Sequence, residues 1–253
     1  MLNSEKNADL LRLDAASSVY TREMLGSILD TCSEMLKDET LSGEIRGKLA
    51  NIDAECCRLI RNRLLLSTLT RFRLENAGEH CCSFTDVFTN CCATVDAICT
   101  QTKAIFEYSR FYLPIKLPMT ADNCCLAILL PIAVALERDP ETQIRLIASK
   151  HTGRIDLDFT FSGEAPDLPK LAAECSKSDG TNGLFFEESL MAECLTNILS
   201  DCGSIMSVKG NRISVSIPIA SEDNKINSPC EPYIDNRFSL PYIVLSRIVK
   251  REI

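Results

Sequence analysis

The chain has 253 residues and a mass of 28.1 kDa, which at a usual domain size of ~150 residues predicts one large domain or two modest ones. Apolar residues make up 45% of the chain and charged residues 25%, a composition that excludes wholesale disorder. Asp and Glu number 35 against 27 for Lys and Arg, and no basic block could follow a phosphate backbone, so we expect no nucleic-acid partner.

The hydropathy of the chain argues against membrane insertion. Its longest nearly uncharged apolar run, Cys124 to Leu136, has 13 residues, whereas a membrane-spanning helix needs ~20, so we predict a buried helix there. Charged residues recur near the N-terminus and leave no uninterrupted hydrophobic stretch of the signal-peptide type. We therefore expect a cytoplasmic protein that does not insert into a membrane and whose cysteines are reduced.

Cysteine is unusually frequent in this chain. Of the 14 cysteines, eight form adjacent pairs, at positions 56/57, 81/82, 91/92 and 124/125. No C-x-x-C motif occurs and only two histidines are present, so we predict no metal site and interpret the cysteines as small apolar side chains. Because neighbouring side chains point in different directions, each pair is expected to place one thiol in the core and the other near the surface.

The first 78 residues predict two long helices. Apolar residues recur at helical spacing from about Asp9 to Lys37, a turn follows, and a second helix extends to about Asn76. The second helix carries an apolar residue at every seventh position, at Ile45, Ile52, Leu59 and Leu66. An antiparallel hairpin of this length has more apolar surface than two helices can bury between them, which predicts dimerisation into a four-helix bundle.

The pattern changes after the hairpin and predicts an α+β domain. Ser83 and Asp86 have the spacing of a capping box at the start of a helix. The elements predicted next are strands at 104–112 and 115–117, a buried helix at 120–138, a strand hairpin over 143–161, a short helix at 166–175, a loop at 177–183, a helix at 186–201 and a strand hairpin over 204–219. We expect the helices to pack on one face of a mixed sheet. A polar linker and an apolar segment, either helix or strand, complete the chain.

Three stretches of the hairpin resemble a known family. Ser18 to Asp30 reads S-V-Y-T-R-E-M-L-G-S-I-L-D, which is similar to S-H-E-L-R-T-P-L-T-S-I-L-G in the first helix of bacterial sensor histidine kinases. Ile52 to Ile60 and Leu74 to Gly78 resemble the end of the second helix of that family. The likeness covers about residues 10–219. It implies a dimerisation hairpin at 1–78, an ATPase-like α/β sandwich of the Bergerat (GHKL) type with a mixed sheet at 79–220, and a C-terminal linker and docking segment at 221–253.

The resemblance also locates the positions at which this family carries its chemistry. The phosphorylated histidine aligns with Val19. The two asparagines that hold magnesium and phosphate align with Pro131 and Ala135, neither of which can ligate a hard cation. The aspartate of the D-x-G-x-G motif, which accepts the adenine amino group, aligns with Phe161 when the motif is anchored on Gly163.

A glycine-rich loop in this family cradles phosphates at a helix N-terminus. Gly183 belongs to a similar-looking stretch, but counting back from Gly203 puts the second glycine of the motif near Ser189, so we assign Gly183 to a lid loop. With the phosphoacceptor and three nucleotide motifs replaced, the resemblance implies a pseudokinase without catalytic residues that uses no ATP, magnesium or other cofactor. We expect the C-terminal segment to cover the sheet edge or the empty nucleotide site.

The sequence therefore predicts a two-component signalling protein, a homodimeric scaffold or regulator that binds a response regulator or another histidine kinase. The family docks the regulator on its first helix, which places the partner-binding residues at Val19, Tyr20, Arg22 and Glu23. Two alternatives stay open. One is an active ATP-dependent histidine kinase with divergent motifs; the other is a domain that binds a different ligand, with Phe161 filling the adenine pocket or stacking on an aromatic guest.

Two further groups of polar residues have structural explanations. His80 follows the hairpin and His151 occupies a predicted turn, so neither lies on the bundle face where a phosphoacceptor is needed. Glu187, Glu188 and Glu193 have no nucleophile beside them, and acids at the start of a helix are typical of a capping pattern.

Overall fold

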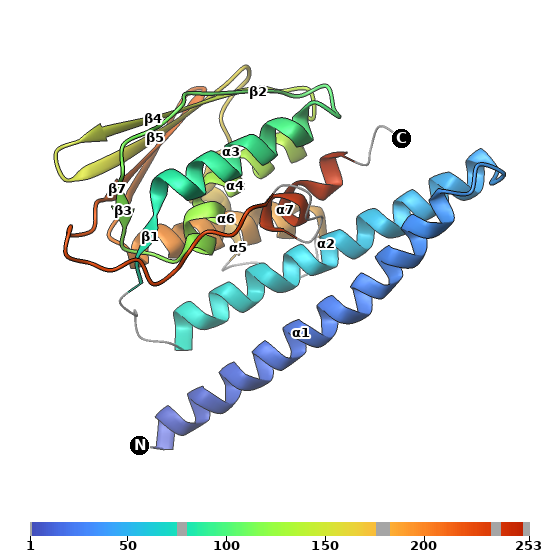
Figure 1. The fold of residues 1–253 in the computed structure, drawn as a ribbon, viewed down its shortest axis with the longest axis horizontal. Coiled ribbons are helices and arrows are strands. Elements are labelled where there is room, and N and C mark those ends of the chain that lie inside the picture. The colour runs from blue at the N-terminus through green and yellow to red at the C-terminus, as the bar shows by residue number, and fades with distance from the viewer. Residues whose placement is uncertain (1, 75–79, 176–182, 234–238, 250–253) are drawn as a thin grey trace.

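Two long antiparallel helices lie along one side of a layered α+β domain in the computed structural model, which describes residues 2–74, 80–175, 183–233 and 239–249 (Figure 1). The hairpin consists of α1 (Leu2–Leu36) and α2 (Gly43–Leu74). Its turn is closed by the Asp38 carboxylate, which accepts from the backbone N–H and the hydroxyl of Thr40 at 2.9 and 2.7 Å, and by Arg46, which donates to the Asp38 carbonyl at 2.7 Å. The predicted hairpin is confirmed.

A five-stranded mixed sheet forms the outer layer of the domain. Its order is β2 (Ile105–Tyr108), β4 (Gln143–His151), β5 (Arg154–Phe161), β7 (Arg212–Pro218) and β6 (Ile205–Lys209). β2 and β4 are parallel and the other pairs are antiparallel, as the two predicted strand hairpins require. Gly153 and Gly210 make the turns at φ +73° and +57°, a region that favours glycine. A small separate ladder joins β1 (Cys82–Ser83) to β3 (Lys116–Leu117).

Helices cover one face of this sheet, so the expected sandwich is confirmed (Figure 1). They are α3 (Phe84–Cys99), α4 (Ala121–Arg138) and α6 (Gly183–Asp201), and α5 (Leu168–Cys175) packs on α6. The predicted cap of α3 is present, since the Ser83 hydroxyl accepts from the Asp86 N–H at 3.5 Å. Every residue of α4 from Cys124 to Leu136 is buried, which confirms the predicted core helix.

The last described element, α7 (Leu240–Val249), is a helix that lies between the hairpin and the domain (Figure 1). Its Ile243 packs in the small core of the hairpin, beside Leu29, Cys56, Cys57 and Ile60. The next residues, Val244 and Leu245, are buried in the main core of the domain. The expectation that this segment covers the sheet edge was wrong, because its apolar side chains fill the gap between α2 and the helices α3 and α4.

The arrangement of the cysteine pairs also differs from the prediction. All 14 cysteines lie in the described residues as free thiols, and both members of each adjacent pair are buried. The pairs of α2, α3 and α4 lie on helices that are enclosed on more than one side, so both directions lead into packed protein. Burial raises the pKa of Cys99 to about 11 and that of Cys194 to about 12, which keeps these thiols protonated and apolar.

Candidate functional site

The positions that align with nucleotide ligands are core positions in this fold. Pro131 and Ala135 are buried in α4, and Phe161 is buried at the end of β5, opposite Ile144. Ala135 and Phe161 belong to the same hydrophobic core. Gly163 is exposed just after β5, and a Cβ added there would meet no atom within 4 Å. None of these side chains presents an oxygen or nitrogen to a ligand.

The remaining candidate for the glycine-rich loop falls at the start of α6. Gly183 is the first residue of this helix, and the loop before it, residues 176–182, lies outside the described residues. Ser189, where the motif count places the second glycine, is buried within α6. Backbone N–H groups at that position are inside a helix, where they are engaged in intrahelical hydrogen bonds and are not free for phosphate.

An aspartate near the D-x-G-x-G position is engaged on the open face of the sheet. Asp158 accepts from the Ser214 hydroxyl at 2.6 Å and from Arg212 at 2.6 and 3.1 Å. Burial acts to raise the pKa of Asp158, but the hydrogen bonds from Arg212 and Ser214 outweigh it and hold the pKa below its ordinary value. The alternation of β5 puts Phe161 in the core and Asp158 on the other face, so this carboxylate stabilises the sheet.

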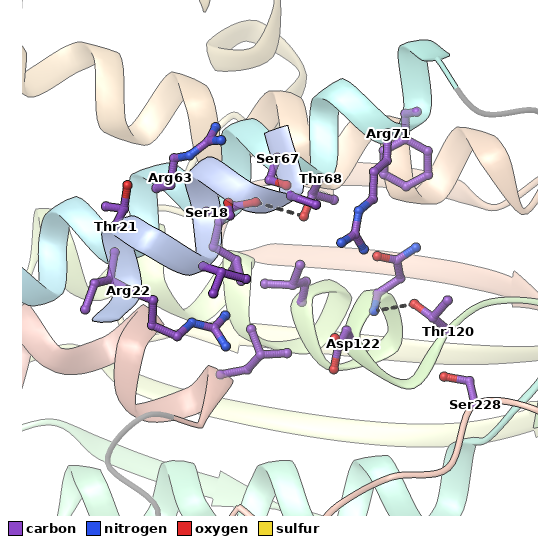
Figure 2. A pocket seen from close by; sticks show the side chains of 18 of the residues that line it. Ser18, Thr21, Arg22, Arg63, Ser67, Thr68, Arg71, Thr120, Asp122 and Ser228 are labelled. Carbon is purple, nitrogen blue, oxygen red and sulfur yellow. Dashed lines mark hydrogen bonds between the residues drawn. The ribbon is translucent and has the colours of Figure 1, made fainter. Parts of the chain in front are cut away.

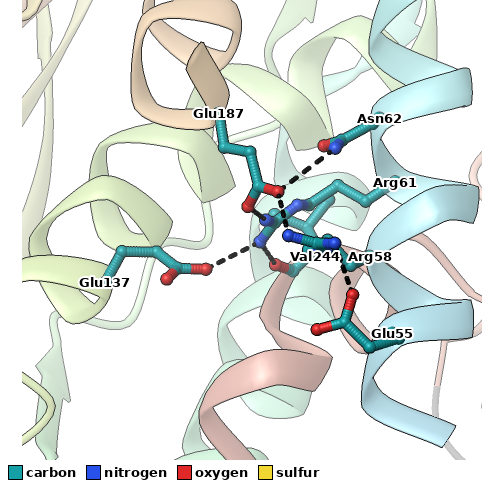
Figure 3. A network of polar contacts seen from close by, with 7 residues as sticks. All are labelled: Glu55, Arg58, Arg61, Asn62, Glu137, Glu187 and Val244. Carbon is teal, nitrogen blue, oxygen red and sulfur yellow. Dashed lines mark hydrogen bonds and ion pairs between the residues drawn. The ribbon is translucent and has the colours of Figure 1, made fainter. Parts of the chain in front are cut away.

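A buried ionic network joins the hairpin to the domain (Figure 3). The side chain of Arg61 in α2 is only 1% exposed and donates to Glu137 at 3.0 Å, to Glu187 at 2.8 Å and to the carbonyl of Val244 at 3.3 Å. Arg58 pairs with the second oxygen of Glu187 at 3.1 Å and also with Glu55. One guanidinium therefore ties together the end of α4, the start of α6 and the C-terminal helix α7.

This network was not found from the sequence, and it corrects one interpretation. Glu187 does not act as a helix cap exposed to solvent, because its carboxylate is 95% buried and faces two arginines from α2. The only sequence signal was Glu137, which comes directly after a long apolar run. Glu188 contributes a second link between α6 and α4 through Arg138, at 2.8 Å.

A pocket of about 520 Å³ opens at the other end of the same interface, between the hairpin and the N-terminus of α4 (Figure 2). Polar side chains reach it from four parts of the chain. They are Ser18, Thr21 and Arg22 of α1, Arg63, Ser67, Thr68 and Arg71 of α2, Thr120, Asp122 and Asn123 at the start of α4, and, from the rest of the domain, His80, Asp201 and Ser228. The volume lies in the range of ~300–1,000 Å³ that is usual for small-molecule sites.

The four predicted partner-binding residues are all exposed on α1. Val19 and Arg22 also line the pocket, although Val19 is 57% exposed, whereas Tyr20 and Glu23 are not part of its lining. Adjacent residues of a helix point about 100° apart, so the four side chains do not all point the same way. Their role in binding a partner stays a prediction.

Neither histidine of the described residues lies where a catalytic group is needed. His80 is exposed at the rim of the pocket, and His151 lies at the tip of the β4–β5 hairpin, 3.3 Å from Asp156. Among the described residues, no three His, Cys, Asp or Glu side chains gather as metal ligands would. No helix in the described part of the chain is both long and apolar enough to cross a membrane.

Comparison with solved structures gives the fold a clear counterpart. Full-length ShkA in complex with AMPPNP matches at a TM-score of 0.57 and 14% sequence identity, over 83% of this chain and 46% of that chain. The histidine kinase AdeS of Acinetobacter baumannii matches at 0.49 and 13% identity, over 79% and 98%. The mycobacterial sensor histidine kinase MprB matches at 0.42 and 13%, over 56% and 98%. This chain thus spans about half the length of ShkA. No protein-family model and no curated protein matches the sequence.

Proposed function

We propose that this chain, which has the fold of a sensor histidine kinase core, is a cytoplasmic two-component signalling protein that has lost catalysis and acts as a dimeric scaffold or regulator. Its partner would be a response regulator or another histidine kinase. The observation that supports this proposal most strongly is the burial of Pro131, Ala135 and Phe161, the positions that align with the nucleotide ligands.

The chemistry of these residues explains why nucleotide binding would be lost. Magnesium binds oxygen ligands, and the side chains of Pro131 and Ala135 carry none. The adenine amino group needs a hydrogen-bond acceptor, and Phe161 offers only an apolar ring that already packs in the core. A buried polar group left without a partner costs about 1–3 kcal/mol, so a bound nucleotide would be penalised rather than held. Val19, at the phosphoacceptor position, has no nucleophilic atom.

The junction between hairpin and domain supports a fixed scaffold. Phosphoryl transfer needs the reacting atoms about 3–3.5 Å apart, so a nucleotide held by the domain must be brought to the acceptor on the hairpin. Arg61 and α7 instead bind α2, α4 and α6 to one another in a single arrangement. A rigid junction suits a protein that presents a constant surface to its partners.

A nucleotide titration tests the loss of ATP binding. We expect the protein with magnesium and a non-hydrolysable ATP analogue to show no saturable heat in calorimetry and no rise in melting temperature up to millimolar analogue. A site with a dissociation constant of 10 μM would stabilise the protein by about 2.7 kcal/mol at 1 mM ligand, which is easily detected. An active histidine kinase core serves as the positive control. Saturable binding at the nucleotide-aligned positions of α4, β5 and α6 would overturn the proposal and restore the active kinase.

Dimerisation is proposed from the exposed side of the hairpin. Apolar residues of α1 recur there at intervals of three, four and seven, and those of α2 at intervals of seven. They are Leu10, Leu13, Tyr20, Met24, Ile28 and Met35 of α1 and Ile45, Ile52, Leu59 and Leu66 of α2. A second copy of this chain offers the same two rows and would bury them in a four-helix bundle. Tyr20 belongs to this set, so we now assign it to the dimer face.

Substitution in this face is expected to separate the dimer. Met24→Glu would place a carboxylate in the apolar interface, where an unpaired charge is strongly disfavoured, and should weaken dimerisation at least about tenfold in sedimentation or light-scattering experiments. Ala8→Glu adds the same charge to the exposed side of α1 that lies about 200° from Leu10, and it should leave the dimer intact. A monomeric wild-type protein, or equal effects of the two substitutions, would contradict the proposed interface.

A further inference from the structure

The pocket between the hairpin and α4 contains two arginines that have no ion-pair partner among the described residues. Arg22 from α1 and Arg71 from α2 point into the same space as Asp122 of α4 (Figure 2). Within the described residues, neither guanidinium forms a hydrogen bond or an ion pair at bonding distance. Two unpaired cationic groups and the carboxylate of Asp122 thus share this pocket, which Asp201 of α6 also lines.

The third arginine of the pocket, Arg63, is paired with a carboxylate of its own chain. Arg63 pairs with the Asp14 carboxylate at 2.8 Å and donates to the Asp14 carbonyl at 2.7 Å, and Ser67 donates to the same carboxylate at 2.6 Å. Arg63 is therefore neutralised by its own chain, and in Figure 2 it points away from Arg22 and Arg71. Among the arginines that line the pocket, Arg22 and Arg71 are thus the two without a partner in the described part of the chain.

The charges of both arginines act on the pKa of Asp122. Partial burial raises the pKa of Asp122, while the charges of Arg71 and Arg22 act to lower it. The first turn of α4 adds a favourable potential for anions, because the positive end of the helix dipole lies there. Apolar side chains complete the lining and could hold the uncharged part of a ligand; they are Val19, Ile60, Leu64, Phe72, Leu126 and Leu240.

We infer that this pocket binds a small organic oxyanion, whose phosphate or carboxylate group lies between the guanidinium groups of Arg22 and Arg71 and whose hydroxyl or amine donates to Asp122. Guanidinium groups bind both kinds of oxyanion through paired, charge-assisted hydrogen bonds. A carboxylate at Asp122 favours a ligand that also carries a donor, so a bare anion would bind less well than a hydroxy acid, an amino acid phosphate or a sugar phosphate.

A ligand bound in this pocket would contact both the helical hairpin and the α+β domain. The ligand would contact α1, α2 and the N-terminal end of α4 at once, whereas the Arg61 network joins α2 to the opposite end of α4 and to α6. A ligand that binds the folded state raises its stability according to its concentration and affinity. The inference does not depend on the loss of nucleotide binding, since none of the nucleotide-aligned positions in α4 or β5 lines the pocket.

The test uses defined probes at constant ionic strength: phosphoserine, glycerol 3-phosphate, malate, citrate, inorganic phosphate and, as uncharged comparison, glycerol. We expect a saturable rise in melting temperature with at least one organic oxyanion, confirmed by calorimetry, and a smaller effect of inorganic phosphate. The phosphate and carboxylate probes show which oxyanion the pocket prefers. No saturable effect of any probe at 10 mM would overturn the inference.

Variants assign the binding to the pocket. Arg22→Gln and Arg71→Gln should each weaken binding of the active probe about tenfold or more, because each removes a charged hydrogen-bonding group. Arg12→Gln removes a charge from an exposed part of α1, where Arg12 lies 3.9 Å from Asp9. This variant should bind the active probe with the same affinity as the wild-type protein. Binding retained in both pocket variants would overturn the assignment.

The same variants separate this inference from the proposed function. If the ATP analogue binds and Arg22→Gln and Arg71→Gln abolish that binding, the phosphates occupy this pocket and the proposed function stands. If the analogue binds equally well to both variants, it occupies another site, and the proposed loss of the nucleotide site is wrong. The oxyanion inference is then decided by the titrations with the organic oxyanions.

Discussion

Replacing Arg61 by methionine is expected to lower the free energy of unfolding by about 3–5 kcal/mol, because the change leaves two carboxylates buried without their main partner. The side chains of Glu137 and Glu187 are only 6% and 5% exposed, so water cannot replace the lost guanidinium. The carbonyl of Val244 also loses a donor. Urea unfolding followed by circular dichroism gives the free energy of each variant.

Two comparisons make the Arg61 result specific. Lys48→Met breaks an exposed pair with Glu44 and should cost no more than about 1 kcal/mol. Combining Arg61→Met with Glu137→Leu and Glu187→Leu should recover most of the lost stability, because an apolar set of similar volume can replace a buried ionic network. If Arg61→Met and Lys48→Met had the same small effect, the network would not hold the hairpin to the domain.

Leu245→Ala is the second change with a large expected effect. Leu245 of α7 is fully buried in the main core, and removal of such a side chain costs about 2–5 kcal/mol through lost burial and the cavity left behind. Ile226→Ala, in the segment between β7 and α7, removes a side chain that is 46% exposed and should change stability by no more than about 0.5 kcal/mol.

The two large effects are also expected to be coupled. Arg61 donates to the carbonyl of Val244, so a shift of α7 caused by Leu245→Ala would weaken that hydrogen bond as well. A double-mutant cycle of Arg61→Met and Leu245→Ala should therefore show an interaction energy of at least about 0.5 kcal/mol. Strictly additive effects, or a Leu245→Ala variant as stable as wild type, would mean that α7 is not part of the junction.

The elements that could be predicted are those with a local signal. Helical and strand periodicity located the hairpin, the sheet and the buried helix α4, while Gly153 and Gly210 marked the turns that positive φ requires. Ser83 and Asp86 marked the start of α3. The type of the last element stayed open, because its short apolar run fits a helix or a strand, and only packing between α2 and the domain selects the helix.

The residues that the sequence did not reveal are joined over long distances. Arg61 meets Glu137 and Glu187 across 76 and 126 positions, and no local pattern records such a meeting. The pocket likewise draws Arg22, Arg71 and Asp122 from three separate helices. For the same reason the resemblance placed Val19 and Arg22 on an exposed face of α1 but could not show that they line a pocket together with residues of α2 and α4.

The position of α7 between the hairpin and the domain has a consequence for the way in which the protein folds. Arg61 and Val244 are 183 positions apart, and Ile243 completes the small core that contains Leu29. Contacts of such high sequence separation form slowly, because the entropy of closing a long loop must first be overcome. During synthesis at about 5–20 residues per second, both the hairpin and the sheet domain would leave the ribosome before the helix that joins their cores. Until α7 arrives, the nascent chain exposes apolar surface on each part, and that interval is when chaperones would bind it.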